Sequence, residues 1–100
     1  MTDTQKQIAQ VCDSVKTLLL EKNIKYGDSA LDPTRIFSKA SATEQILVRI
    51  DDKLSRISRG QGLLLDDEDV LQDLIGYLVL LKISLDRDVK SSYNTDHIDL

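Results

Sequence analysis

The apolar run between residues 70 and 83 restricts the fold of this chain more than any other segment. Built as a helix, it carries aliphatic side chains on nearly every side: Val70, Leu71, Leu74, Ile75, Leu78, Val79, Leu80, Leu81 and Ile83. A helix that is apolar all round is buried on most sides. Three helices in a chain of 100 residues cannot cover it fully, so we expect a homodimer or a higher oligomer.

Two further segments each carry one apolar stripe at helical spacing. In residues 3–23 the stripe consists of Ile8, Val11, Cys12, Val15, Leu18 and Leu19. This places the single cysteine, Cys12, in the core. The next helix begins at Ser41 and Glu44, which have the spacing of a capping box, and Gly60 ends it. Its predicted stripe is Ile46, Leu47, Ile50, Leu54 and Ile57.

The third helix is predicted to begin at the carboxylates of residues 66–69, which favour a helix N-terminus, and to continue to about Asp86. Residues 88–100 have no sustained periodicity and are predicted to form a flexible tail after a single domain of residues 1–87. We find no predicted strand. The expected fold is all-α, an antiparallel bundle of three long helices plus a short helical turn, completed by oligomerisation.

That short turn is expected in the long connector over residues 24–40. Asp32-Pro33 has the form of an N-cap followed by proline at the first helical position. It predicts one turn of helix over residues 33–38 that buries Ile36 and Phe37. A connector of this length inside a compact domain is often functional.

Composition sets the class of protein and of partner. The chain is 41% hydrophobic and 30% charged, which is ordinary for a soluble globular protein. Its net charge of −4 argues against nucleic acid or an anionic membrane as the main partner. One cysteine gives neither a disulfide nor a thiolate metal site, and the N-terminus does not resemble a secretory signal. We therefore expect a cytoplasmic protein.

Four charged residues lie beside the apolar stripe of the second helix. Arg49, Asp52, Lys53 and Arg56 have the spacing i, i+3, i+4, i+7, so they form a second stripe at the edge of the core. Two interpretations are open. The charges form ion pairs on a solvated face, with Asp52 and Arg56 at i, i+4, or they face a ligand in a groove between helices.

Two carboxylates share one face of the apolar helix. Asp69 and Asp73 lie at i, i+4, on the same side as Gly76. Neighbouring carboxylates on a buried helix are costly unless a cation lies between them. Arg49 or Lys53 could supply that cation to Asp73, leaving Asp69 as a first-turn carboxylate, or Mg²⁺ could bind both.

The sequence KNIKYGDS at residues 22–29 is the third candidate. Lys25, Tyr26 and Ser29 surround Gly27 and offer a cation, a stacking ring and a hydroxyl at a helix end. These groups suit a phosphate and a base. The same residues also fit a plain helix C-terminus, where lysine and glycine are common.

In this order, KNIKYGDS, RIDDKLSRI and EDVLQDLIGY resemble the nucleotide modification associated domain 1 family of phages and bacteria. The family pattern is a YG-S element, an R-x-x-D-K-x-x-R helix and a D-x-x-x-D-L-x-x-Y helix. The resemblance covers roughly residues 22–83. It implies a small helical protein of nucleotide metabolism or DNA-base modification, in a bacterial cell or a phage-infected host.

A more distant likeness is to the all-α nucleoside triphosphate pyrophosphohydrolases of the MazG and dimeric dUTPase group. Those enzymes bind Mg²⁺ through E-x-x-E and E-x-x-D helices and hydrolyse a nucleoside triphosphate to a monophosphate and pyrophosphate. Glu68, Asp69 and Asp73 match the second helix loosely. At the first helix, Asp52 stands with Lys53 where those enzymes have paired glutamates, which fits phosphate binding better than hydrolysis.

Three functions follow as expectations. The first is a nucleotide-binding protein, in its fullest form a Mg²⁺-dependent pyrophosphohydrolase. It would use the base-side and phosphate-side groups Lys25, Tyr26, Ser29, Arg49, Lys53 and Arg56, with Mg²⁺ on Asp52, Asp69 and Asp73. The second is a non-catalytic, phage-type protein that sequesters a nucleotide or a signalling nucleotide. The third is a structural or regulatory helical module whose charges form internal ion pairs.

Overall fold

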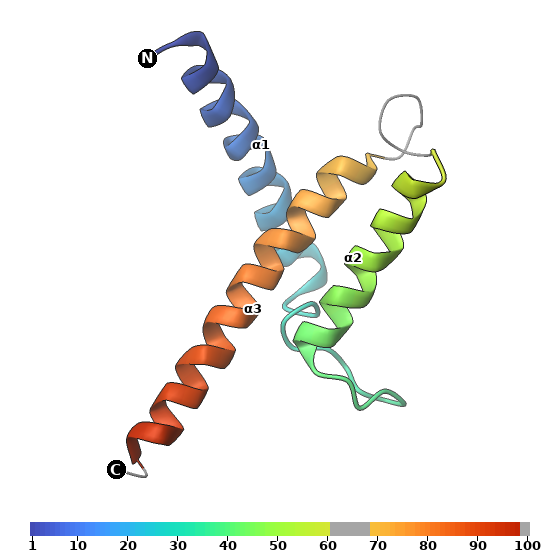
Figure 1. Cartoon of the computed structure of the whole chain (residues 1–100), viewed down its shortest axis with the longest axis vertical. Coiled ribbons are helices and arrows are strands. Elements are labelled where there is room, and N and C mark those ends of the chain that lie inside the picture. Colours follow the sequence, from blue (N-terminus) through green and yellow to red (C-terminus); the bar gives the residue numbers. More distant parts are fainter. Residues whose placement is uncertain (61–68, 99–100) are drawn as a thin grey trace.

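The computed structural model describes the backbone of residues 1–60 and 69–98 and, within those ranges, the side chains up to residue 90. These residues form three helices and no strand: α1 (Asp3–Tyr26), α2 (Ala42–Ser58) and α3 (Val70–Ile98) (Figure 1). The predicted all-α class is confirmed. None of the three helices, as far as they are described, has the length and apolar character that a membrane span needs.

Each helix begins at a polar side chain that caps its first turn: Thr2, Ser41 and Asp69. The Ser41 hydroxyl accepts a hydrogen bond from the backbone N–H of Glu44 at 3.1 Å, which is one of the two bonds of the predicted capping box. The Asp69 carboxylate accepts from the backbone N–H of Gln72 at 2.8 Å. Such caps stabilise a helix by about 1 kcal/mol. The predicted start at residues 66–68 lies outside the described residues.

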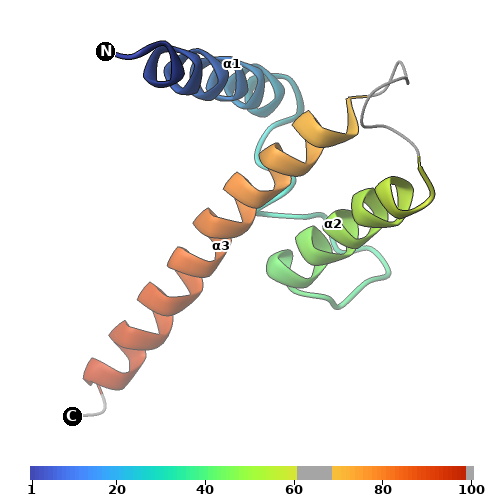
Figure 2. The same ribbon diagram turned by 45° about the horizontal axis from the view of Figure 1, so that its top comes forward.

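The helices form an antiparallel pair with a third helix across it. α2 runs along α3 in the opposite direction, whereas α1 crosses α3 at a steep angle and packs against α3 alone (Figures 1 and 2). Gly76 permits the close approach at this crossing, because a Cβ there would lie 3.1 Å from Cδ2 of Leu19. The antiparallel neighbours are therefore α2 and α3. α1 crosses α3 and does not form the third helix of an antiparallel bundle.

The core is small and lies mainly between α2 and α3. Its buried apolar residues are Val15, Ile46, Ile50 and Val70. A pair of hydroxyl groups joins the two helices near the start of α2, where the oxygens of Thr43 and buried Ser84 lie 2.6 Å apart. Leu47 and Leu54 belong to the predicted stripe of α2, yet both are exposed, because they flank the side of α2 that packs on α3.

The prediction that Cys12 belongs to the core is wrong. Cys12 is exposed, as are Ile8 and Val11 on the same stripe. The stripe itself is real, and its later residue Val15 is buried. The N-terminal half of α1 extends past the crossing with α3 (Figure 1), so neither of the other two helices covers the first half of the stripe.

The predicted helical turn over residues 33–38 is also wrong. That segment is irregular, and Ile36 and Phe37 are 76% and 96% exposed. The turn instead lies just before Pro33, where the carbonyl of Asp28 accepts hydrogen bonds from the backbone N–H groups of Leu31 at 3.1 Å and Asp32 at 2.7 Å. The observed turn therefore ends before the proline, whereas the predicted turn was to begin at it.

α3 continues beyond its predicted end near Asp86, through Ile98. The prediction relied on apolar periodicity, which the sequence loses in this segment. The backbone of residues 88–98 is nevertheless helical. The predicted flexibility of residues 88–100 and the domain boundary at residue 87 stay predictions.

Candidate functional site

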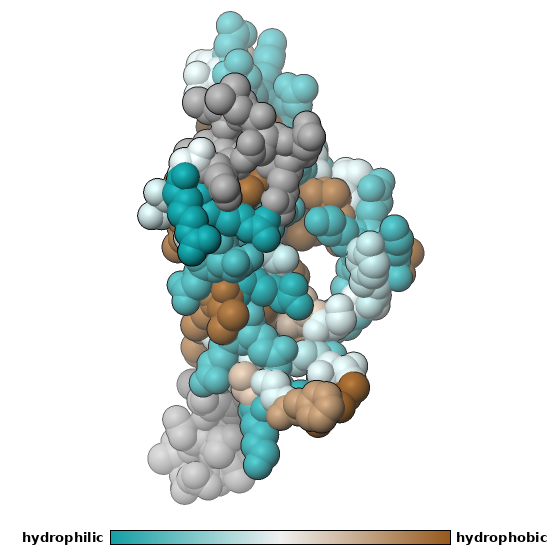
Figure 3. All heavy atoms as spheres, turned by 90° about the vertical axis from the view of Figure 1, so that its right-hand side faces the viewer, coloured by the Kyte–Doolittle hydropathy of each residue, from teal (hydrophilic) through white to brown (hydrophobic). Residues whose placement is uncertain are grey.

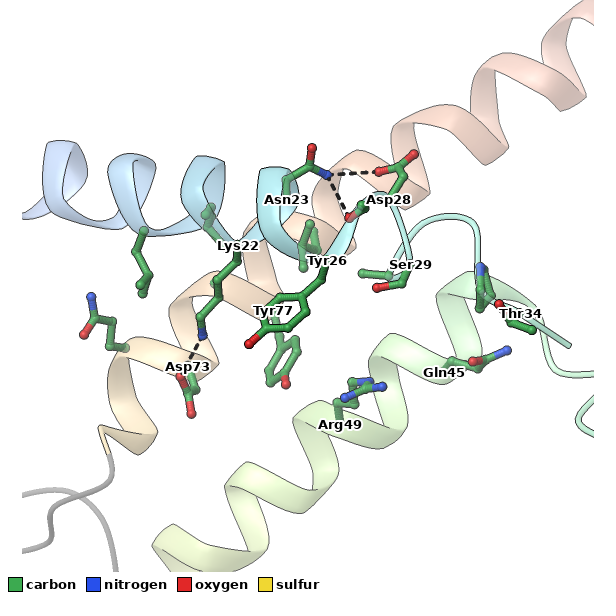
Figure 4. Close-up of a pocket in the computed structure, with 18 residues that line it drawn as sticks. Lys22, Asn23, Tyr26, Asp28, Ser29, Thr34, Gln45, Arg49, Asp73 and Tyr77 are labelled. Atoms are coloured by element: carbon green, nitrogen blue, oxygen red, sulfur yellow. Dashed lines mark hydrogen bonds and ion pairs between the residues drawn. The ribbon is translucent and has the colours of Figure 1, made fainter. Parts of the chain in front are cut away.

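A cavity of about 580 Å³ lies where the end of α1, the following connector and the facing sides of α2 and α3 meet (Figure 4). This volume is within the range of small-molecule and cofactor pockets. Its apolar wall comes from leucines of α1 and α3. Its polar wall comprises Lys22, Asn23, Tyr26, Asp28, Ser29, Thr34, Gln45, Arg49, Gln72, Asp73 and Tyr77.

The end of α1 shapes one side of the cavity. Gly27 ends the helix with φ +69°, a left-handed conformation that favours glycine. The Asn23 amide then donates to the carbonyl of Gly27 at 3.4 Å and to Oδ1 of Asp28 at 3.3 Å. These bonds turn the chain back on itself and bring Ser29 to the cavity wall.

Lys22 and Tyr26 lie four residues apart on α1 and therefore share the face that lines the cavity. Lys25 is next to Tyr26 in sequence, so it points about 100° away. It is absent from the cavity wall, and its Nζ lies 5.2 Å from the centre of the Tyr26 ring. Lys22 takes the place that the sequence analysis gave to Lys25, and the i, i+4 spacing from Tyr26 is the signal that could have identified it.

Asp73 is the anionic centre of the α3 side. Its carboxylate lies 3.1 Å from Nζ of Lys53 and 3.8 Å from Nζ of Lys22. The side chains of Lys53 and Asp73 are only 10% and 26% exposed. Burying charged side chains to this extent costs free energy unless each charge is paired with one of opposite sign. The structure thus gives Asp73 a lysine partner, which was one of the two predicted alternatives, while Asp69 serves as the α3 cap.

Arg49 contributes a cation from the opposite side. It is exposed, and its guanidinium extends from α2 toward the tyrosines in Figure 4. Within residues 1–60 and 69–90, no carboxylate forms an ion pair with it. Arg49 and Lys22 lie on different helices around one cavity. An anionic group between them would receive charge-assisted hydrogen bonds from two sides.

Two aromatic rings complete the wall. Tyr26 of α1 and Tyr77 of α3 both extend into the cavity (Figure 4). An aromatic side chain offers a stacking surface to a base, worth about 1–3 kcal/mol per base in single-stranded nucleic acid complexes. Tyr77 was not predicted as a site residue. Its spacing of four residues from Asp73 puts both on one face of α3, and that spacing could have indicated it.

The cavity brings together four of the nine predicted site residues: Tyr26, Ser29, Arg49 and Asp73. Lys53 joins them through its ion pair with Asp73. The structure places Lys25, Asp52, Arg56 and Asp69 elsewhere, with Asp52 and Arg56 3.6 Å apart on α2. The described residues contain no group of three His, Cys, Asp or Glu side chains placed to hold a metal, so Asp52, Asp69 and Asp73 do not form one ligand set.

Comparison with protein-family models, with curated protein sequences and with solved structures finds no match to this chain. The resemblance to the nucleotide modification associated domain 1 family therefore rests on the three sequence motifs. Function has to be argued from the cavity itself.

Proposed function

We propose that this protein binds a nucleotide, or a small molecule derived from one, in the cavity between α1, α2 and α3. One observation carries the proposal: two cations and two tyrosines line the same cavity. Arg49 and Lys22 would hold the phosphate, and Tyr26 and Tyr77 would hold the base. Ser29, which also lines the cavity, would donate or accept a hydrogen bond to the sugar or the base.

Binding without chemistry is the form of this proposal that the side chains favour. Each carboxylate expected to hold Mg²⁺ already has another role: Asp73 pairs with lysine, Asp52 with Arg56, and Asp69 caps α3. A pyrophosphohydrolase would have to release Asp73 from Lys53 before a metal could use it. We therefore propose the sequestration of a nucleotide in a bacterial or phage-infected cytoplasm, with Mg²⁺-dependent hydrolysis as the competing activity.

The ion pairs themselves favour a second candidate, a structural or regulatory helical module. Asp52 and Asp73 are both paired with cations of the same chain, as that hypothesis requires. It gives no role to Arg49, because an exposed arginine without a carboxylate partner in the described structure adds little to stability. Arg49 therefore separates the two candidates.

The first experiment is a thermal-shift screen of nucleoside mono-, di- and triphosphates, each with and without Mg²⁺. A ligand that binds only the folded state stabilises it by about 2.7 kcal/mol at one hundred times its Kd, so weak ligands are detectable at millimolar concentration. We expect a metal-independent rise in Tm and recovery of the nucleotide unchanged. Released pyrophosphate would assign hydrolysis instead, and no shift with any nucleotide would favour the structural module.

Arg49→Ala then tests the site. Hydrogen bonds to charged groups contribute about 1.5–3 kcal/mol, so we expect the Kd of the best ligand to rise at least tenfold by calorimetric titration. Arg87→Ala is the matched control, since Arg87 is an exposed arginine of α3 outside the cavity, and it should bind like the wild type. Equal affinity in both variants would contradict the proposed site.

A further inference from the structure

Five leucines of α3 follow a heptad pattern that the cavity does not use. They stand at alternating spacings of three and four: Leu71, Leu74, Leu78, Leu81 and Leu85. Leu71, Leu78 and Leu85 are 48%, 48% and 45% exposed, and the other two are half-buried. Residues with this spacing lie in one line along a helix. We call these five residues the leucine stripe.

The leucine stripe lies on the side of α3 that neither α1 nor α2 covers. Asp73, Tyr77 and Leu80 lie at i, i+4, i+7 on another face, which lines the cavity or packs on α2, and Gly76 meets α1. Figure 3 shows hydrophobic atoms exposed near the middle of its left edge. α3 therefore has a third, apolar face that neither α1 nor α2 covers fully.

α2 extends this apolar surface. Leu47 and Leu54 are seven residues apart and exposed. At about 100° per residue they lie on one flank of α2, and Arg49, which faces the cavity, lies on the other. Because α2 and α3 are antiparallel neighbours, the flank with Leu47 and Leu54 is on the same side as the leucine stripe.

The size of the exposed surface indicates what should cover it. The accessible surface is 8142 Å², whereas a compact monomer of 11.3 kDa exposes about 5,700 Å². The radius of gyration is 16.6 Å, against about 13 Å for a compact domain of 100 residues. The excess of roughly 2,400 Å² is larger than the ~800 Å² that each partner buries in a standard dimer interface.

From these observations we infer that the leucine stripe is a two-fold interface with a second copy of this chain, α3 against α3. Leucines at alternating three- and four-residue spacing interdigitate with the same pattern on a partner helix, and a two-fold contact uses one surface on both subunits. The contact ends after Leu85, where the next position of the pattern is Asp88, bonded to Thr43 at 2.8 Å. This interface does not depend on the proposed nucleotide site.

Sedimentation equilibrium of the full chain tests the interface. The wild type should be a dimer at micromolar concentration, and Leu78→Glu, at the centre of the leucine stripe, should be a monomer. Val48→Glu is the matched control. Val48 is 66% exposed on the outer side of α2, so the same change there should leave a dimer. A wild-type monomer at every concentration, or a Leu78→Glu dimer as stable as the wild type, would overturn the inference.

A milder variant keeps the test decisive if Leu78→Glu does not fold. Leu78→Ala preserves the helix, because alanine has the highest helix propensity, and circular dichroism checks the helical content. Each dimer loses two leucine side chains from the interface, and apolar side chains stabilise an interface in proportion to the area that they bury. We expect the dissociation constant of the dimer to rise at least tenfold. An unchanged dissociation constant in a folded variant would also overturn the inference.

Discussion

The α2–α3 pair has two sides that differ in chemistry. One side carries Arg49 and Asp73, which line a cavity together with Lys22 of α1 and two tyrosines, and the other carries the leucine stripe. Both sides draw on the same helix, because α3 places residues at i, i+4, i+7 on one face and its heptad leucines on another. On the cavity side Lys53 and Asp73 form an ion pair, whereas three of the five leucines are exposed in the described part of the chain.

The difference indicates what each side needs from outside. Lys53 and Asp73 form an ion pair, so these two charges need no ligand, and Arg49 is left to bind one. Contact with water does not stabilise the side chains of the leucine stripe. They are stabilised when the apolar surface of another molecule buries them. The cavity side is thus suited to a small anion, and the stripe to a protein.

The largest effect should come from removing the buried carboxylate of the cavity side. Asp73→Ala removes the carboxylate that lies 3.1 Å from Nζ of Lys53, and breaking a buried ion pair costs about 3–5 kcal/mol. Because Asp73 is 26% exposed, we expect about 3 kcal/mol, measured as a lower midpoint of urea unfolding with an unchanged slope.

Asp86→Ala is the control for Asp73→Ala. Asp86 accepts from Nζ of Lys82 at 2.8 Å, but both side chains are more than half exposed. Exposed pairs at i, i+4 contribute about 0.3–0.5 kcal/mol. Similar losses in the two variants would show that the Lys53–Asp73 pair is no more important than a surface pair.

A smaller effect is expected at the α1–α3 crossing. Gly76→Val adds side-chain atoms where even a Cβ would meet Leu19 at 3.1 Å, and overpacking costs about 1–3 kcal/mol. The variant should also lose ligand affinity, since Gly76 lines the cavity.

The free energy of unfolding of Gly76→Ala should lie within 1 kcal/mol of the wild-type value, because a gain of about 1 kcal/mol in helix propensity offsets the close contact. Unfolding and titration of both variants would measure this, and full affinity in Gly76→Val would contradict the position of α1.

The smallest effect on stability should come from Lys22→Ala. Lys22 is half-exposed and 3.8 Å from Asp73, so its loss should change the free energy of unfolding by less than about 0.5 kcal/mol. Its loss should nevertheless raise the Kd of the ligand at least tenfold, as for Arg49→Ala. A variant that loses stability but keeps its affinity would show that Lys22 serves the fold and not the ligand.

The helices could be predicted from the sequence because their signals are local. Spacings of three and four residues, and the cap at Ser41, depend on neighbouring residues only. Which neighbour covers a stripe depends on tertiary packing, and there the predictions failed. The stripe of α1 is real, but Cys12 lies beyond the crossing with α3 and is exposed.

The candidate site was predicted in part, for the same physical reason. Tyr26, Ser29, Arg49 and Asp73 meet at the cavity, as their residue types indicated. Lys25 was preferred to Lys22 because of its place next to Tyr26 in the motif, although helical geometry pairs Tyr26 with Lys22. Residue types suggested the chemistry, and only the packing of three helices could show which of them converge.

We propose that a nucleotide binds on one side of the α2–α3 pair and a second subunit on the other. Two-dimensional NMR of ¹⁵N-labelled protein, titrated with the best nucleotide of the thermal-shift screen, locates the nucleotide residue by residue. We expect shift changes at Lys22, Tyr26, Arg49 and Tyr77, with Leu71 and Leu85 at the ends of the leucine stripe unaffected. Changes confined to the leucine stripe, or none at saturating nucleotide, would contradict the proposal.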